Sequence, residues 1–297
     1  MQASAISVII LSYNTLDITK TCLGKLKIAI KHFEKTTKKK VETIVVDNAS
    51  IDSSAQALSK YKWLTLIKST ENLGFARANN LAMRQAKGDY FLLLNSDVFV
   101  TKDTLVKAYD YVLNKKTDVL GCKLAYKDSR LQPSAGFIPS PTNILFWMFG
   151  IDKLPIVKDI VKPFHPNHES FFDKDRKVGW IMGAFMFLRR EVFLRTGGFD
   201  DNYFMYTEEV EWCKRIADTG FKIVYTPSFS IVHLGAASSN FDNAQSVTKE
   251  FDGVVYFFKK HFPGFILWAK LLIFLGSFIR IIKSPVYARV MFDIWKK

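Results

Sequence analysis

Short apolar runs alternate with stretches of helical spacing throughout the first 126 residues, and this alternation limits the possible folds most strongly. The apolar runs lie at residues 6–11, 41–46, 64–68, 90–94 and 119–126. Helical spacing of apolar residues lies between them, at 16–33, 53–61, 75–86 and 102–114. A chain that alternates in this way forms βαβ units, with helices covering both faces of a parallel sheet. The sequence therefore predicts an α/β fold with a mostly parallel central sheet.

Polar, turn-forming residues follow four of these runs. They are Ser12-Tyr13-Asn14, Asp47 to Asp52, Asn72 to Arg77, and Asn95-Ser96-Asp97. Taken singly, a residue such as Ser50 or Asp52 is most simply a helix N-cap. Parallel sheets nevertheless bind ligands beyond the carboxyl ends of their strands. Four polar strand ends at one edge of the sheet therefore favour a binding site there.

The second half of the chain is predicted to complete the same domain. Residues 140–177 contain four prolines and read as an irregular insertion, in which the segment from His165 to Glu169 is a solvated loop. After the insertion we expect a strand at 178–188, helices at 190–196 and 208–217, and strands near 222–225 and 230–233. The three cysteines, Cys22, Cys122 and Cys213, are too widely spaced for a disulfide scaffold and fit a reducing compartment, most simply the cytosol. The N-terminus lacks a basic leader, so it reads as a buried strand and not as a signal peptide.

The basic excess of the chain is concentrated near its C-terminus. Lysine and arginine number 42 against 28 acidic residues, and residues 259–297 are also rich in Phe, Ile, Leu and Trp. Basic and apolar residues together favour an anionic membrane surface, and no nucleic-acid recognition motif is found.

The stretch 265–282 has the composition of an amphipathic helix. As a helix it would place Lys270, Gly276, Ser277, Arg280 and Lys283 on one arc, opposite a broad apolar face. We expect it to lie in the plane of a membrane with its cations on the head groups. The alternative is a helix packed on the catalytic domain or on a dimer partner.

Two acidic clusters could carry chemistry. Asp97 follows an apolar strand, where a carboxylate suits a divalent cation that bridges a diphosphate. Glu208 and Glu209 begin a predicted helix; the helix dipole alone could favour them there. The aromatic residues before them would, however, raise a carboxylate pKa and suit a general base. His233, at another strand end, could be a further metal ligand.

Six stretches carry a resemblance to a known family. They are SVIILSYN, IVVDNASIDSS, STENLGFARANN, GDYFLLLNSDV, GAFMFLRREVFLRTGGFDDNYFMYTEEVEW and IVHLGAASS, in this order over about residues 5–240. In these stretches the chain resembles the inverting family-2 glycosyltransferases, which have the Rossmann-like GT-A fold, and in particular their bacterial rhamnosyltransferase-like branch. The usual dinucleotide and P-loop glycine motifs are missing from the sequence.

The resemblance implies a role for each matching residue. Glu209 matches the catalytic base, as a glutamate where the family more often has aspartate, and Asp97 and His233 match ligands of Mg²⁺ or Mn²⁺. Asn95 replaces the first aspartate of the family's DXD motif. The residues implied in donor binding are Ser12, Tyr13, Asn14, Asp47, Asn72, Gly74, Arg77, Asn79, Asn95 and Ser96. Those implied on the acceptor side are Trp180, Gly183 and Glu208.

The resemblance also implies an activity. We expect transfer of one sugar, with inversion, from a nucleoside diphosphate donor to a glycan acceptor linked to polyprenyl diphosphate. By analogy dTDP-L-rhamnose is the first donor to consider, followed by UDP-hexoses. A non-enzymatic basic adaptor would explain the charge but not the ordered motifs. A sugar-nucleotide pyrophosphorylase would need a glycine-rich basic loop where this chain has Ser12-Tyr13-Asn14.

The predicted organisation has two parts. Residues 1–240 form the GT-A domain, with a nucleotide-binding half at 1–126, the insertion at 140–177 and the catalytic and acceptor half at 178–240. Residues 241–297 form a helical, membrane-associating region. We expect a protein attached peripherally to the cytoplasmic face of a bacterial inner membrane.

Overall fold

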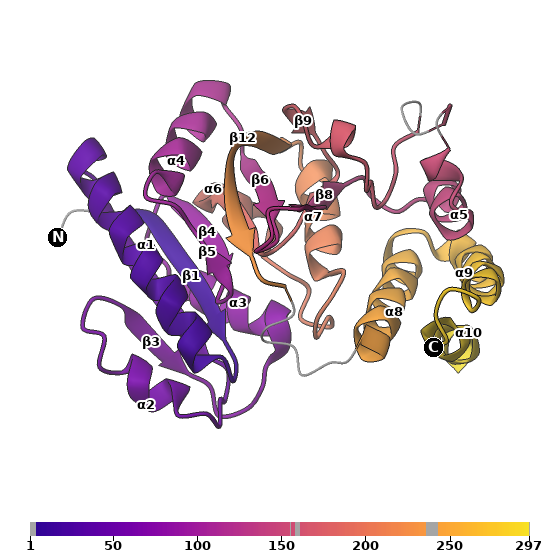
Figure 1. Cartoon of the computed structure of the whole chain (residues 1–297), viewed down its shortest axis with the longest axis horizontal. Helices are drawn as coiled ribbons and strands as arrows, with labels where there is room; N and C mark the ends of the chain where they lie inside the picture. Colours follow the sequence, from indigo (N-terminus) through magenta and orange to yellow (C-terminus); the bar gives the residue numbers. More distant parts are fainter. Residues whose placement is uncertain (1–3, 155, 158–160, 236–242, 297) are drawn as a thin grey trace.

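A single mixed sheet forms the centre of the molecule (Figure 1). The computed structural model describes residues 4–154, 156–157, 161–235 and 243–296. The strand order in the sheet is β3-β2-β1-β4-β11-β6-β12-β5, and β11 runs antiparallel between β4 and β6. The bounds are β1 Ser4–Ser12, β2 Lys40–Asp47, β3 Thr65–Lys68, β4 Tyr90–Asn95, β5 Val98–Phe99, β6 Val119–Ala125, β11 Phe185–Arg189 and β12 Ile223–His233. The prediction of an α/β fold with a mostly parallel sheet is confirmed.

Helices cover both faces of the sheet, because successive residues of β1 point to opposite sides. Val8 and Ile10 pack with α1 and α4 in one core, whereas Ile9 packs with α3 and α7 in the other. The helices of this part are α1 Leu16–Thr37, α2 Ser54–Leu58, α3 Gly74–Gln85, α4 Thr104–Lys115, α6 Arg190–Thr196 and α7 Glu208–Asp218.

Three local predictions were wrong. The supposed irregular insertion begins with a helix, α5 (Pro141–Phe149), which Ser140 and Asn143 cap reciprocally. The two strands expected near 222–225 and 230–233 are one strand, β12, whose pairing with β6 shifts register between Thr226 and Ser230, around Pro227. The strand expected at 178–188 is divided into β10 (Trp180–Ile181), which pairs with β8 (Ala135–Gly136), and β11. Two further short strands, β7 (Leu131–Gln132) and β9 (Arg176–Lys177), pair with β6 and β12.

The C-terminal helices pack on the rest of the chain. Phe251, Phe257 and Phe258 of α8 (Asn243–His261) are buried in the same core as Trp212 of α7. Beyond α8, the helices α9 (Ile266–Arg280) and α10 (Val286–Asp293) lie beside α5 at the end of the molecule (Figure 1). The expected domain boundary at residue 240 falls outside the described residues.

The orientation of α9 is the reverse of the prediction. Lys270, Gly276 and Ser277 of the polar arc are buried, and a side chain at Gly276 would collide with Met148 of α5. Small residues let the two helices approach, so the polar arc became the packed face. For the polar arc of α9, the alternative prediction of a helix packed on the catalytic domain is therefore correct.

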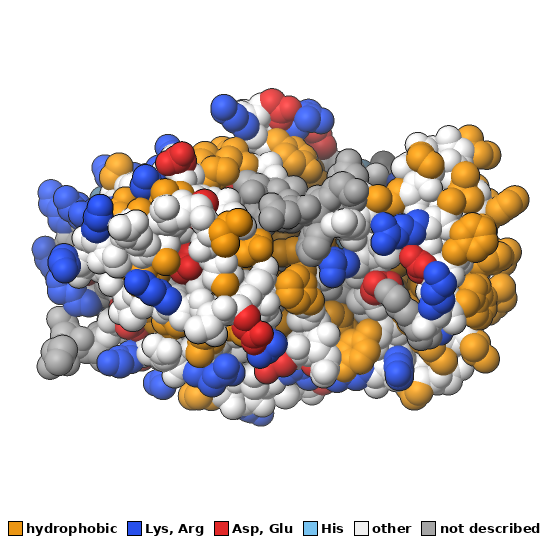
Figure 2. Space-filling model, turned by 90° about the horizontal axis from the view of Figure 1, so that it is seen from below, with side chains coloured by type: hydrophobic (Ala, Val, Ile, Leu, Met, Phe, Trp, Pro, Cys, Tyr) orange, Lys and Arg blue, Asp and Glu red, His pale blue; other side chains and the backbone are white. Residues whose placement is uncertain are grey.

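Much of the apolar side of α9 faces outward instead, although Leu272 and Ile273 are buried. Figure 2 shows hydrophobic side chains gathered at this end of the molecule. The exposed apolar residues of α9 and its continuation are Leu267, Trp268, Leu271, Leu275, Phe278, Ile279 and Ile282. In the described part of the chain, one helical stretch, Pro263–Arg280, is long and apolar enough to span a bilayer, and a third of it is buried in the protein. Core helices of soluble proteins can meet the same criterion.

Candidate active site

A cavity of about 440 Å³ opens where the ends of β4 and β12 meet the start of α7. Six of the residues predicted from the sequence line it: Asn95, Asp97, Gly183, Glu208, Glu209 and His233. The other lining residues are Phe75, Tyr126, Gln132, Met182, Ala184, Met205, Tyr206, Leu234, Gly235 and Ser246. The structure thus brings the two acidic clusters of the sequence to one cavity.

Strand pairing places Asp97 beside His233. His233 of β12 pairs with Val98 of β5, and the backbone N–H of Leu234 donates to the carbonyl of Asp97 over 3.1 Å. As a result, His233 Nε2 lies 3.2 Å from Asp97 Oδ1. On the far side of the ring, His233 Nδ1 lies 2.9 Å from Gln132 Oε1. Gln132 belongs to the short strand β7, and no motif in the sequence marked it.

This pair fits a divalent cation. Because the amide oxygen of Gln132 accepts, the proton of a neutral His233 sits on Nδ1 and leaves a lone pair on Nε2. Asn95 Nδ2 lies 3.4 Å from this Nε2 and Asp97 Oδ1 lies 3.2 Å from it, so the imidazole nitrogen and the carboxylate are close enough to be ligands of one cation. Mg²⁺ commonly takes one or two protein ligands and completes its shell with phosphate oxygens and water. Among the described residues, no group of three His, Cys, Asp or Glu side chains forms a metal cage.

A strained turn presents the two carboxylates of α7. Tyr206 and Thr207, directly before the helix, both have left-handed backbone, with φ of 74° and 72°. Non-glycine residues adopt this conformation at a cost of about 1–3 kcal/mol each and keep it only when the surroundings enforce it. Here α8 does so: Thr207 Oγ1 donates to the Glu250 carbonyl over 3.3 Å, and a side chain at Gly253 would lie 2.6 Å from that hydroxyl.

Burial sets the protonation of the two carboxylates. It raises the pKa of Glu209 to about 7, with a further rise from nearby Glu250 and an opposing effect of His165. Burial, and then the charge of Glu209, also raise the pKa of Glu208 well above its usual range. One oxygen of each, Oε2, is buried without a hydrogen-bond partner among the described residues. A pKa of about 7 lets Glu209 alternate between accepting and holding a proton near neutral pH.

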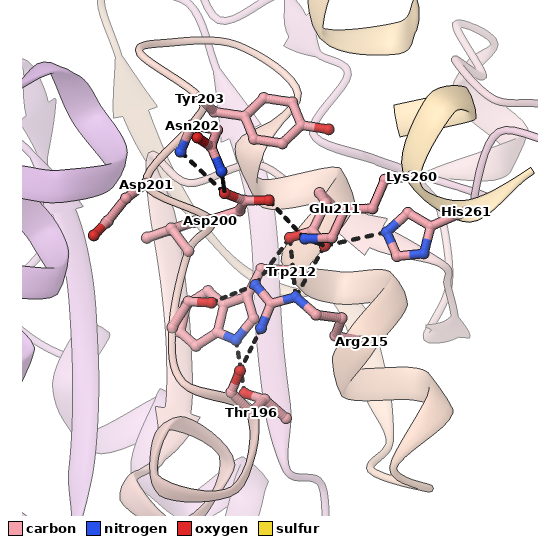
Figure 3. Close-up of polar contacts among 12 residues, drawn as sticks. Thr196, Asp200, Asp201, Asn202, Tyr203, Glu211, Trp212, Arg215, Lys260 and His261 are labelled. Atoms are coloured by element: carbon pink, nitrogen blue, oxygen red, sulfur yellow. Dashed lines mark hydrogen bonds and ion pairs between the residues drawn. The ribbon is translucent and has the colours of Figure 1, made fainter. Parts of the chain in front are cut away.

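The third acid of this helix has a different role. Figure 3 shows Arg215, Lys260 and His261 converging on Glu211, which is fully buried. Glu211 accepts from Arg215 Nε over 2.9 Å and from His261 Nε2 over 3.1 Å, and it pairs with Lys260 Nζ over 2.8 Å. Burial opposes ionisation of Glu211, but the hydrogen bonds from Arg215 and Lys260 outweigh it and lower its pKa. Glu211 thus stays charged and fastens α7 to α8.

The ends of β1 and β2 are bound to each other. The backbone N–H of Asn14 donates to Ser50 Oγ over 3.0 Å, and Asn14 Oδ1 accepts from Ile51 N over 2.8 Å. Asp47 Oδ2 accepts from Ser50 N over 3.2 Å, whereas Asp47 Oδ1 is buried without a partner among the described residues. Tyr13 is half-buried beside them. A ligand that donates hydrogen bonds would satisfy Asp47.

The segment after β3 joins this edge to the catalytic turn. Asn72 Oδ1 accepts from Asn48 Nδ2 over 2.8 Å and from Gly74 N over 2.9 Å. Gly74 has φ of +73°, and a side chain there would lie 2.4 Å from the carbonyl of Phe204. Only glycine allows that approach. Arg77 is exposed and pairs with Glu71 over 3.6 Å.

Four of the candidate residues turn their side chains into the interior. Ser12 Oγ lies 3.0 Å from Thr19 Oγ1, and Ser96 Oγ lies 3.3 Å from Thr15 Oγ1. Asn79 donates to the Phe75 carbonyl of its own helix over 2.9 Å. Trp180 Nε1 donates to the Phe164 carbonyl over 3.0 Å. The structure places these residues behind the cavity wall and not on it.

The sequence suggested that His165 lies in a solvated loop, and the structure shows that it does not. It is half-buried, its ring centre lying 5.1 Å from that of Trp147 and 5.3 Å from that of Trp180. Its Nε2 lies 3.0 Å from Glu250 Oε1. His165 is thus held by Trp147 of α5, Trp180 of β10 and Glu250 of α8, all of which are distant from it in the sequence.

Solved structures share this fold. The mannosyltransferase PcManGT of Pyrobaculum calidifontis, in complex with GDP-Man and Mn²⁺, superposes with a TM-score of 0.59 at 19% identity, covering 98% of this chain and 74% of its own. Staphylococcus aureus TarS residues 1–349, in complex with UDP, superposes with a TM-score of 0.54 at 16% identity, covering 100% and 92%. These superpositions show that the chain has a GT-A-like α/β fold.

The chain belongs to glycosyl transferase family 2, because the model of that family matches residues 7–196. Rhamnosyltransferase WbbL of Escherichia coli K12 is 29% identical over 82% of this chain and 87% of its own length. The N-acetylglucosaminyl-diphospho-decaprenol L-rhamnosyltransferase of Mycobacterium tuberculosis is 26% identical over 77% and 78%. The enzyme class predicted from the sequence, an inverting glycosyltransferase, is thereby confirmed.

Proposed function

We propose that this enzyme transfers L-rhamnose from dTDP-L-rhamnose to a glycan carried on polyprenyl diphosphate. Two relatives similar along most of the chain are rhamnosyltransferases, and the name of one specifies a diphospho-decaprenol acceptor. A UDP-hexose donor is the second candidate, because the chain is also 31% identical over 135 residues to a poly(ribitol-phosphate) β-N-acetylglucosaminyltransferase.

A single observation carries the proposed chemistry: Glu209, with a pKa of about 7, lines the same cavity as Asp97 and His233. Glu209 takes the proton of the acceptor hydroxyl as that oxygen attacks the anomeric carbon, and the neighbouring Glu208 contacts the acceptor in the same cavity. A divalent cation held by Asp97 and His233 would neutralise the charge that develops on the departing diphosphate. One base and one displacement invert the anomeric configuration.

The proposed site of action is the cytoplasmic face of a bacterial inner membrane. The exposed apolar side chains of α9 are continued by Phe292 and Trp295, which are 66% and 49% exposed. Lys283, Arg289 and Lys296 are exposed in the same segment and would meet anionic head groups. In this arrangement the exposed apolar side of α9 enters the membrane interface, and its polar arc packs against the rest of the enzyme.

A donor and acceptor panel tests the proposal. Full-length enzyme is incubated with Mn²⁺, a synthetic N-acetylglucosaminyl-diphospho-prenol acceptor, and dTDP-rhamnose, UDP-glucose, UDP-N-acetylglucosamine or GDP-mannose in turn. We expect the mass of the acceptor to increase by one rhamnose. Transfer of only a UDP-linked sugar would replace the donor assignment with the second candidate. If no donor is transferred or hydrolysed, the chain is a membrane adaptor that has kept the fold.

A further inference from the structure

A second cavity, of about 720 Å³, lies between α5, α9 and α10. The end of α5, Ile279 and Arg280 of α9, and the side chains of Lys153, His165 and Glu250 contribute to its wall. Within the described part of the chain, no residue lines both this cavity and the active-site cavity. The glycosyl transfer described above gives this space no role.

The wall of the second cavity is cationic and partly rigid. Lys153, Arg280 and Lys283 line the cavity together with Glu250, which already contacts His165 over 3.0 Å. The buried carboxyl group of Asp152, outside the lining, also interacts electrostatically with Lys153 and Arg280. The guanidinium of Arg280 lies 5.1 Å from the ring centre of Trp147 and 5.6 Å from that of Tyr287, and it donates to the Trp147 carbonyl. A cation fixed in this way loses little freedom when it binds an anion. Fixed and exposed cations together suit an anion of more than one charge.

An apolar surface begins at the rim of this cavity. Ile279 lines the cavity and is also 50% exposed, while its neighbours Phe278 and Ile282 are 65% and 91% exposed. A free phosphate would gain nothing from these side chains. A ligand with a charged head and an apolar chain would use both features.

The inner wall of the cavity reaches the catalytic turn. Glu250 and His165 both line the cavity, and Nε2 of His165 lies 3.0 Å from Oε1 of Glu250. The backbone carbonyl of Glu250 also accepts from Thr207, two residues before the base. Glu250 of α8 thus lines the second cavity and also holds the turn that carries the proposed base.

We propose that this cavity binds the diphosphate of the lipid-linked acceptor, with Lys153, Arg280 and Lys283 on the phosphate oxygens. The prenyl chain then lies along the exposed side of α9, and the sugar is directed toward Glu209. This assignment rests on the proposed function and names its acceptor subsite.

A binding measurement that needs no donor tests the subsite. Geranylgeranyl diphosphate is titrated into full-length enzyme in neutral detergent by calorimetry, with geranylgeraniol and inorganic diphosphate as parallel ligands. We expect the prenyl diphosphate to bind more tightly than either. The double variant Lys153→Gln/Lys283→Gln should lose about tenfold in affinity per lysine, the effect of one charge-assisted hydrogen bond. Lys259→Gln, an exposed lysine on α8 outside the cavity, is the matched control.

Each alternative outcome overturns the assignment. Equal affinity for geranylgeraniol would show that the cations do not take part, and equal affinity for inorganic diphosphate would show that the apolar chain does not. Equal competition by phosphatidylglycerol vesicles would assign the cavity to a membrane head group. Glu209→Gln should bind the prenyl diphosphate like the wild type. If binding is as expected but no sugar is transferred, the proposed function fails while the subsite stands.

Discussion

Replacing Glu209 by glutamine should stabilise the protein while it removes activity. The rise of the Glu209 pKa from the ordinary value of 4.5 to about 7 corresponds to about 3 kcal/mol for keeping the carboxylate ionised in the folded state. Because the folded-state pKa is raised, this cost is fully present above pH 7 and declines as the pH falls toward 4.5. Glutamine has the same shape and no charge, so it avoids the cost.

The assay is urea unfolding of wild type and Glu209→Gln at pH 8 and pH 5.5. We expect the variant to be more stable by up to about 3 kcal/mol at pH 8, and by about 1 kcal/mol at pH 5.5. Glu169→Gln, at an exposed glutamate outside the active-site cavity, should change stability by less than about 0.5 kcal/mol at both pH values. If Glu209→Gln is no more stable than the wild type at pH 8, the carboxylate is not held in a costly environment, and the argument for its raised pKa is refuted.

Three further predictions follow from the same structure. Since Glu209 must be ionised to act, kcat/KM should fall about tenfold per pH unit below about pH 7, and a flat profile down to pH 5 would contradict the assignment. Excess EDTA should abolish transfer, Mn²⁺ should restore it, and Asp97→Ala should weaken donor binding; full activity in EDTA would exclude the metal site. Leu267→Ser/Phe278→Ser should abolish sedimentation with phosphatidylglycerol vesicles at unchanged folding, whereas a variant that still sediments would place the membrane contact elsewhere.

The first half of the fold was predictable because its signals are local. Buried parallel strands such as β1 and β4 read as continuous apolar runs, and the helices between them have clear spacing. Once these strands were assigned, the parallel topology predicted that their polar ends lie at one edge of the sheet. Asp97 and His233 could be assigned to one metal site from a family resemblance, and strand pairing brings them together.

The missed features depend on contacts between distant segments. Gln132, which orients His233, lies in a two-residue strand, and Glu250 reaches His165 from a helix 85 residues further along the chain. Local sequence patterns cannot predict such contacts between distant segments. The helix α5 was missed although its capping signal, Ser140 followed by Pro141 with Asn143 two residues further on, is visible in the sequence.

The orientation of α9 shows a limit of amphipathic patterning. The angular distribution of residues separates a polar arc from an apolar face, but it does not say which of them packs on the protein. Gly276 and Ser277 are small enough for close helix packing, and Arg280 finds the carbonyl and ring of Trp147. The polar arc is buried although Ser277 Oγ has no hydrogen-bond partner among the described residues, and much of the apolar face is left outside.

The most direct test of the account is the single-turnover transfer rate of wild type, Glu209→Gln and Glu208→Gln, measured with the donor that the panel identifies. If Glu209 is the base, its glutamine variant should transfer about 10²–10⁴-fold more slowly, with donor affinity little changed. Glu208→Gln changes a carboxyl group that is not the base and should lose much less. A Glu209→Gln enzyme near the wild-type rate, beside an inactive Glu208→Gln, would contradict the account and move the base by one residue.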